Sequence, residues 1–165
     1  MTPETSIQVI GLKDALAELK RVEPQLRKQL TRSIKGDAAP LVNAARELVP
    51  IGAPLSGMRT GKFAWSAKAR SGIGIKMGGR ARGNEFTILS LRQNEGVGMI
   101  FDMAGKKGGN NKKGEEFIAA LSARFGRPSR SMWPAAEKTL PQVTEAITAT
   151  IDEALGDINR RLLTK

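Results

Sequence analysis

Residues 127–163, RPSRSMWPAAEKTLPQVTEAITATIDEALGDINRRLL, form the stretch that decides the fold. Its apolar side chains recur every three or four residues, at Ala136, Leu140, Val143, Ile147, Ile151, Leu155, Ile158 and Leu162. This spacing is typical of an amphipathic helix with one apolar face. We therefore predict a long C-terminal helix over residues 133–163, about 45 Å in length at about 1.5 Å per residue. Pro141 lacks a backbone N–H, so we expect a kink or a restart there.

A single helix cannot bury such a face by itself, so other elements must pack along it. Residues 12–48 supply helical candidates, first a short helix with leucines at positions 12, 16 and 19 and then a second helix whose first residue is Pro24. The second pattern contains Pro40, which cannot donate a hydrogen bond to the carbonyl of Gly36. We predict a kink or break between Ile34 and Leu41 for that reason.

Four segments are predicted to be strands. Residues 6–10 (SIQVI) are β-prone and precede Gly11, and residues 73–77, 86–91 and 97–103 follow a basic loop and form a β-meander within residues 57–105. The last two would be joined by a hairpin turn at residues 94–96 (NEG). The prediction is a single α+β domain over residues 1–165, in which a small antiparallel sheet of about four strands packs against two long helices.

Residues 105–114, GKKGGNNKKG, consist only of glycine, lysine and asparagine. Because none of these side chains favours burial in a core, we predict a flexible loop when the protein is alone. Phe117, Leu121 and Phe125 then recur four residues apart and predict a short helix over residues 115–125, which Gly126 would end.

Positive charge is concentrated in the middle of the chain. The protein has a formal net charge of +11, and residues 57–114 contain twelve lysines and arginines against three acids, a net charge of +9. Such a surface suits a polyanion or an acidic protein partner, although a solvated basic face has the same composition. The basic residues of this segment are Arg59, Lys62, Lys68, Arg70, Lys76, Arg80, Arg82, Arg92, Lys106, Lys107, Lys112 and Lys113.

The composition leaves few groups for catalysis. Cysteine, histidine and tyrosine are all absent, which excludes disulfides, thiol nucleophiles and zinc sites built on Cys or His, and removes the usual general base near neutral pH. The glycines of residues 72–79 lack the spacing and context of a phosphate-binding loop. We therefore predict no enzyme activity, no catalytic residues, no cofactor and no metal.

The sequence also indicates where the protein is made. The longest apolar runs fall short of the roughly 18 residues that span a bilayer. Residues 1–14 lack the basic and apolar regions of a signal peptide. We expect synthesis in a cytoplasm, without secretion by the standard route and without a membrane partner.

Four features, taken in order, resemble the neck or tail-completion proteins of long-tailed bacteriophages. Residues 59–66 (RTGKFAWS) resemble the R-T-G-x-L-x-x-S stretch of that family, which likewise follows a helix and a Pro-Gly-rich break. Residues 101–105 (FDMAG) are similar to its V-E-F-x-G stretch, and residues 128–136 (PSRSMWPAA) to the P-F-L-R-P-A sequence before its last helix. The opening strand that ends in Gly-Leu is similar as well. Met132 and Trp133 depart from the usual Phe-Leu, and residues 105–126 are longer and more basic.

This resemblance implies a structural virion protein, present in the neck or tail and made in the cytoplasm of a bacterial host. Its copies would form a homo-oligomeric ring, a hexamer, that joins the head connector to the tail tube. A tail terminator and a head-completion stopper remain alternatives within this class, and a basic, non-sequence-specific DNA-binding protein is the alternative from another class. For the ring-forming virion proteins, the lumen of the ring would permit non-specific contact with DNA.

The interface hypothesis concerns two loops and one aromatic residue. Both loops would contact neighbouring subunits or adjoining particle proteins, and the aromatic residue would anchor the start of the last helix. The candidate assembly residues are Arg59, Thr60, Gly61, Lys62, Phe63, Trp65, Lys106, Lys107, Lys112, Lys113 and Trp133.

Overall fold

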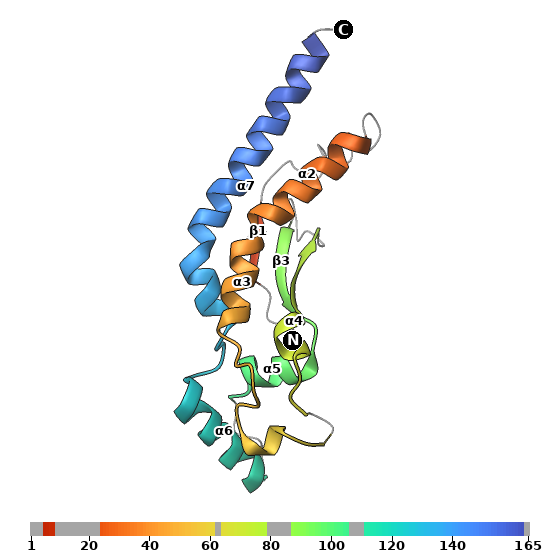
Figure 1. The fold of residues 1–165 in the computed structure, drawn as a ribbon. Helices are drawn as coiled ribbons and strands as arrows, with labels where there is room; N and C mark the ends of the chain where they lie inside the picture. The colour runs from red at the N-terminus through yellow and green to blue at the C-terminus, as the bar shows by residue number, and fades with distance from the viewer. Residues whose placement is uncertain (1–4, 9–23, 62–63, 79–86, 106–110, 164–165) are drawn as a thin grey trace.

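A computed structural model describes residues 5–8, 24–61, 64–78, 87–105 and 111–163 of the chain. These residues form a mostly helical α+β structure in which the long C-terminal helix packs against the N-terminal helices (Figure 1). The predicted short helix with leucines at 12, 16 and 19 lies outside the described residues.

The helical layer contains α2 (Pro24–Asp37), α3 (Ala39–Glu47) and α7 (Met132–Leu163). The predicted break between Ile34 and Leu41 is confirmed, because α2 ends and α3 begins on either side of the buried Ala38. Pro24 occupies the first position of α2, also as predicted. The break is fixed against α7 by a hydrogen bond of 2.7 Å from Thr150 Oγ1 to Asp37 Oδ2.

Helix α7 continues through Pro141, which excludes the restart predicted there, whereas the alternative of a kink stays a prediction. A proline removes the hydrogen bond to the carbonyl four residues earlier, here that of Glu137. Pro141 and Glu137 are both exposed, and water can therefore satisfy the carbonyl that the proline leaves without a donor. The helix also begins one residue before the predicted start, at Met132.

The sheet of the described residues has three strands, β1 (Thr5–Gln8), β2 (Ile73–Met77) and β3 (Thr87–Gln93), in the order β1-β3-β2. Both pairings are antiparallel, with Thr5 opposite Leu91 and Ile73 opposite Gln93. The three strands were predicted to within a few residues at each end. Strand β3 lies in the centre, which leaves β1 and β2 as the two edges.

The predicted strand over residues 97–103, and with it the fourth strand, is wrong. These residues belong to helix α5 (Gly96–Met103), whose buried residues Val97 and Phe101 are four apart. Residues that alternate along a strand also include pairs four residues apart, and such pairs lie on one face of a helix. The predicted hairpin turn is replaced by a helix start, where the Glu95 N–H donates to Gln93 Oε1 at 3.0 Å. Gly98 is required here, because an added Cβ would lie 2.2 Å from Gln93 Nε2.

The predicted loop over residues 105–114 is also wrong at its end. Helix α6 (Lys112–Phe125) begins three residues earlier than predicted, so Lys112 and Lys113 are helical. Asn111 caps this helix, with its Oδ1 accepting a hydrogen bond from the Gly114 N–H at 3.4 Å. Gly126 ends α6 with φ of 82°, as predicted.

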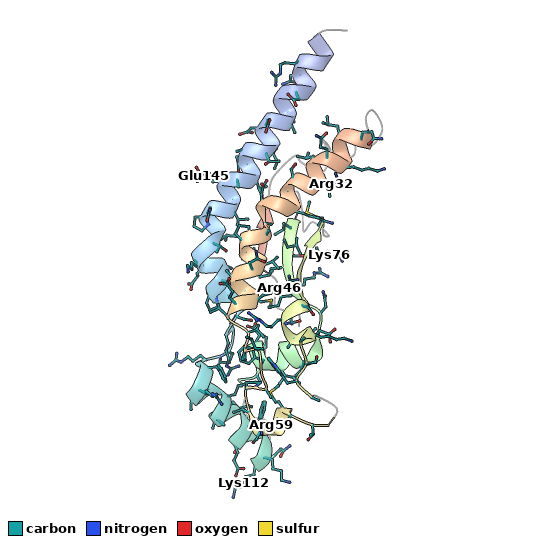
Figure 2. All side chains as sticks on the ribbon, viewed as in Figure 1. Arg32, Arg46, Arg59, Lys76, Lys112 and Glu145 are labelled. Carbon is teal, nitrogen blue, oxygen red and sulfur yellow. The ribbon has the colours of Figure 1, made fainter. Side chains whose placement is uncertain are left out.

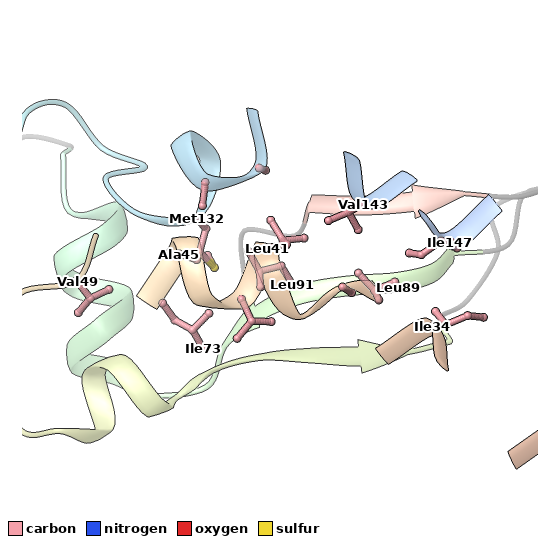
Figure 3. Packing of buried hydrophobic residues seen from close by; sticks show 14 of the residues in the cluster. Ile34, Leu41, Ala45, Val49, Ile73, Leu89, Leu91, Met132, Val143 and Ile147 are labelled. Carbon is pink, nitrogen blue, oxygen red and sulfur yellow. The ribbon is translucent and has the colours of Figure 1, made fainter. Parts of the chain in front are cut away.

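The main core lies between the helical layer and the sheet. Strand β3 contributes Leu89 and Leu91, α2 and α3 contribute Ile34 and Leu41, and α7 contributes Ile147, all of them buried (Figure 3). Helices α3 and α7 lie side by side, and α7 extends beyond the sheet at its C-terminal end (Figure 1). Helices α5 and α6 and the loop after α3 lie at the opposite end of the molecule, which contains most of the predicted interface residues.

Candidate assembly interface

The RTG loop, defined here as residues 58–65 and described at residues 58–61 and 64–65, has a closed base. Its two ends are joined by a hydrogen bond of 2.7 Å from the Trp65 N–H to the Met58 carbonyl. Between them Arg59, Thr60 and Gly61 are exposed. Gly61 has φ of +89°, a conformation that residues with a Cβ rarely adopt, which explains the glycine at this position of the motif.

The base of the RTG loop is fixed in the interior. Met58, in the short 3₁₀ helix η1 (Ser56–Met58), is buried. Trp65 packs edge-on against Phe101 of α5, with ring centroids 5.7 Å apart, and its Nε1 donates to the Ile51 carbonyl at 3.3 Å. Phe101 contacts Phe125 of α6 in the same way at 5.3 Å. Trp65 therefore docks this loop on the core.

Lys112 and Lys113 lie at the same end of the molecule as Arg59 (Figure 2). Both lysines are exposed in the first turn of α6. Helix α6 is tied to the segment before the RTG loop, because Arg124 Nη1 donates to the Pro54 carbonyl at 3.0 Å. The structure thus brings Arg59, Thr60, Gly61, Trp65, Lys112 and Lys113 onto one end of the molecule.

The remaining predicted residues divide into two groups. Lys62, Phe63, Lys106 and Lys107 lie outside the described residues. Trp133 is described, and its predicted role as the anchor of the last helix is wrong because 54% of its surface is exposed. The neighbouring Met132, 3% exposed, packs into the core in its place.

The start of α7 is held by a buried cluster that the sequence analysis missed. We call Arg130, Asp102 and their hydrogen-bond partners the polar hub. Asp102 is 1% exposed, and its Oδ1 accepts hydrogen bonds from the Ser131 N–H and Oγ at 2.6 Å and from the Met132 N–H at 3.2 Å. A carboxylate in this place satisfies N–H groups that have no partner within the helix and favourably meets the positive end of the helix dipole.

Arg130 completes the hub from the other side. Its guanidinium, 7% exposed, donates to the Phe101 carbonyl at 2.7 Å, to the Ala104 carbonyl at 2.9 Å and to Ser122 Oγ at 3.2 Å. It also donates to the Gly126 carbonyl at 2.9 Å. The carbonyls belong to the C-terminal ends of α5 and α6, where a cation is favoured. The hub therefore connects three helix ends.

Two opposite effects act on the pKa of Arg130 in the hub. Burial lowers the pKa of the Arg130 guanidinium, and the negative charge of Asp102 opposes this shift. Arginine remains protonated in proteins, so the cation persists. Asp102 Oδ2 is buried and has no hydrogen-bond partner among the described residues. Both residues lie in motifs noted in the sequence, Asp102 in residues 101–105 and Arg130 in residues 128–136. That the two lie close together could be seen only in the folded structure.

A shallow hollow of about 380 Å³ lies beside α3 and α4 (Lys68–Ser71). Both arginines that line it are hydrogen-bonded to backbone carbonyls. Arg46 Nη2 donates to the Ile73 carbonyl at 2.7 Å, and Arg70 Nε donates to the Arg46 carbonyl at 2.9 Å. Glu47 also lines it and offsets their charge. The hollow is therefore explained by contacts that join α3 to α4 and β2.

The described residues contain no cluster of three or more acidic, histidine or cysteine side chains placed to hold a metal ion. None of the helices there combines the length and the hydropathy needed to cross a bilayer. No protein-family model, curated protein or solved structure matches the chain.

Proposed function

We propose that this protein is a ring-forming structural subunit of a phage neck, joining the head connector to the tail tube. The observation that carries the proposal is the construction of the RTG loop. Its base is fixed by Met58 and Trp65, whereas Arg59, Thr60 and Gly61 are exposed at its tip. The order of this motif, the FDMAG segment and the segment before the last helix supports the same assignment by resemblance.

The physical argument concerns the cost of binding. A loop that must order when it binds loses conformational entropy, so a loop that is already held at its base binds at a lower cost. The tip has no apolar side chain among its described residues 59–61. It suits a contact made by hydrogen bonds and charge, which is typical of the polar rim of an interface.

The basic charge of the middle segment favours a second candidate, a non-sequence-specific DNA-binding protein. Residues 57–114 have a net charge of +9, and the exposed Arg59, Lys112 and Lys113 lie at one end of the molecule. Phosphate contacts of this kind weaken steeply with salt. A free subunit whose affinity for duplex DNA fell steeply between about 50 and 200 mM salt would favour this candidate.

Virions provide the main test. We expect mass spectrometry to find the polypeptide in purified particles and electron microscopy to place it between head and tail. A host expressing the phage without this gene should accumulate heads and tails that do not join. Particles that are complete and infectious without the polypeptide would refute the proposal.

The loop residues provide a second test. The double substitution Arg59→Ala and Thr60→Ala should leave the fold unchanged, because both side chains are exposed, but should reduce head–tail joining in a complementation assay. Lys106→Ser and Lys107→Ser form a separate double variant for the second predicted loop. Lys68→Ala, at an exposed lysine outside both loops, is the control. Normal joining with both double variants would show that the loops have no role.

A further inference from the structure

Helix α2 has a basic outer face. Residues 24–36 contain four lysines and arginines and no acid. Lys28, Arg32 and Lys35 follow at spacings of four and three residues and are all exposed, whereas Leu26 and Leu30 are buried on the other side of the helix. We call these three residues the basic stripe. None of their side chains has a hydrogen bond or an ion pair with another described residue.

The edge strand beside this helix is basic as well. Strand β2 lies at the edge of the sheet, and Lys76 on it is exposed. Arg32 and Lys76 lie on the same flank of the molecule (Figure 2). A lysine on an edge strand discourages strand-to-strand pairing with another molecule. A partner of this flank is therefore expected to present acidic side chains rather than a strand edge.

Helix α7 has the opposite character. Residues 139–159 contain four carboxylates and no lysine or arginine, in a protein whose net charge is +11. Glu145, Asp152 and Glu153 are exposed, whereas Val143 and Ile147 are buried on the other side. We call these three acids the acidic stripe. They form no ion pair with another described residue, unlike Asp157, which pairs with Arg160.

The two stripes match in length and lie on different flanks. Lys28 and Lys35 are seven residues apart, as are Glu145 and Asp152, so each pair spans about 10.5 Å along its helix. Glu145 lies on the flank opposite to Arg32 and Lys76 (Figure 2). The stripes of one molecule therefore face away from each other, and each could meet the other only in a second copy.

We infer that the basic stripe on α2 of one copy docks against the acidic stripe on α7 of the next copy. This contact joins two different patches, and such heterologous contacts form a ring when the rotation between copies closes. The inference rests on the proposed ring-forming function and names the surfaces that make the ring. Opposite charges across an interface fix register and partner choice, and like charges oppose association.

Two charge-reversal variants test the contact. The first, Lys28→Glu with Arg32→Glu, changes the charge of the basic stripe from +3 to −1, and the second, Glu145→Lys with Asp152→Lys, changes that of the acidic stripe from −3 to +1. Either variant alone should need at least about a tenfold higher concentration to assemble, because every contact then joins like charges. The control, Lys68→Glu with Arg127→Glu, changes the net charge as the first variant does, at exposed positions outside both stripes.

Mixing the two variants gives the decisive measurement. An acidic-flanked copy can contact basic-flanked copies on both sides, so an equimolar mixture should assemble as the wild type does. Native mass spectrometry should then find equal numbers of the two variants in each ring. Circular dichroism and thermal unfolding of each variant, compared with the wild type, verify that the folds are intact. Assembly should also weaken from about 0.1 M to 1 M salt, because the Debye length falls from about 10 Å to 3 Å.

Three outcomes would overturn the contact. They are normal assembly of either variant alone, failure of the mixture when the wild type and the control assemble, and loss of DNA binding by the first variant without any loss of self-association. Virions that incorporate either variant alone as efficiently as the wild type would refute the contact but leave the proposed function standing. Virions without the polypeptide would refute the proposed function itself.

Discussion

At one end of the molecule α2, α3 and α7 pack on the sheet through apolar side chains, whereas at the other end α5, α6 and the start of α7 meet around the polar hub. The first region buries Ile34, Leu41, Leu91 and Ile147, which interact without strict direction. The second depends on the five hydrogen bonds that Arg130 donates. Apolar packing tolerates small adjustments, but a buried polar network fails when one member is removed.

This contrast bears on the proposed interface. The RTG loop is anchored through Trp65 to Phe101 of α5, and Arg130 binds the Phe101 carbonyl. The hub therefore determines the position of the loop, while the apolar region determines whether the domain folds. The following variants test this division.

The largest effect is expected from Arg130→Met, which removes every hydrogen bond of the guanidinium, including the buried one to the Phe101 carbonyl. We expect a loss of about 3–5 kcal/mol in the free energy of unfolding, measured by urea denaturation. Hydrogen exchange should show α5 and α6 losing protection before α2 and α3. Arg130→Lys should not restore the loss, because one ammonium cannot replace the planar fork. A loss below about 1 kcal/mol would contradict the importance of the hub.

Ile147→Ala tests the apolar region. The change leaves a cavity between α7 and the sheet, so a loss of about 2–4 kcal/mol is expected by the same measurement. Here protection should fall in the helices and in β3 together. Thr148→Ala, at the next and exposed position, is the matched control and should have little effect. Equal losses from both changes would place the core elsewhere.

Asp102→Ala removes the cap of α7 and should cost about 1–3 kcal/mol, because the Ser131 and Met132 N–H groups lose their acceptor. Glu137→Ala removes an exposed carboxylate of α7 outside the acidic stripe and serves as the comparison. Thermal unfolding measured by calorimetry distinguishes the two. Indistinguishable melting temperatures would show that the cap contributes nothing.

The smallest effect is expected from Trp133→Ala. With 54% of its surface exposed, its loss should change the free energy of unfolding by less than about 0.5 kcal/mol. Met132→Ala should cost about 2 kcal/mol or more, since that side chain is buried. A reversal of this order would restore Trp133 as the anchor. If Trp133→Ala keeps the fold but impairs head–tail joining, the residue contributes to the interface instead.

The apolar region was largely predictable from the sequence. The spacing of Val143, Ile147 and Ile151 predicted α7, and Pro40 predicted the break between α2 and α3. The alternating residues 73–77 predicted β2. In these elements the buried side chains recur with the period of the helix or strand, and this period is visible in the amino-acid sequence.

The region around the hub was not predictable in the same way. Residues 97–103 alternate as a strand would, yet also place Val97 and Phe101 on one helical face. The choice depends on Gln93, which lies before the helix and packs against Gly98. Lys112 and Lys113 were predicted to lie in a loop. The helix start there depends on one hydrogen bond to Asn111, and an asparagine among other polar residues does not stand out as a helix cap.

The sequence by itself determined α7, the strands β1, β2 and β3, the charge distribution and the presence of the RTG motif, because each depends on residues close together in the chain. Only the tertiary structure decided that Asp102 and Arg130 meet, that Met132 rather than Trp133 enters the core, and that the basic and acidic stripes lie on opposite flanks. Those outcomes depend on the direction in which a side chain points from its element. That direction is fixed by packing between segments far apart in the chain, which no local pattern records.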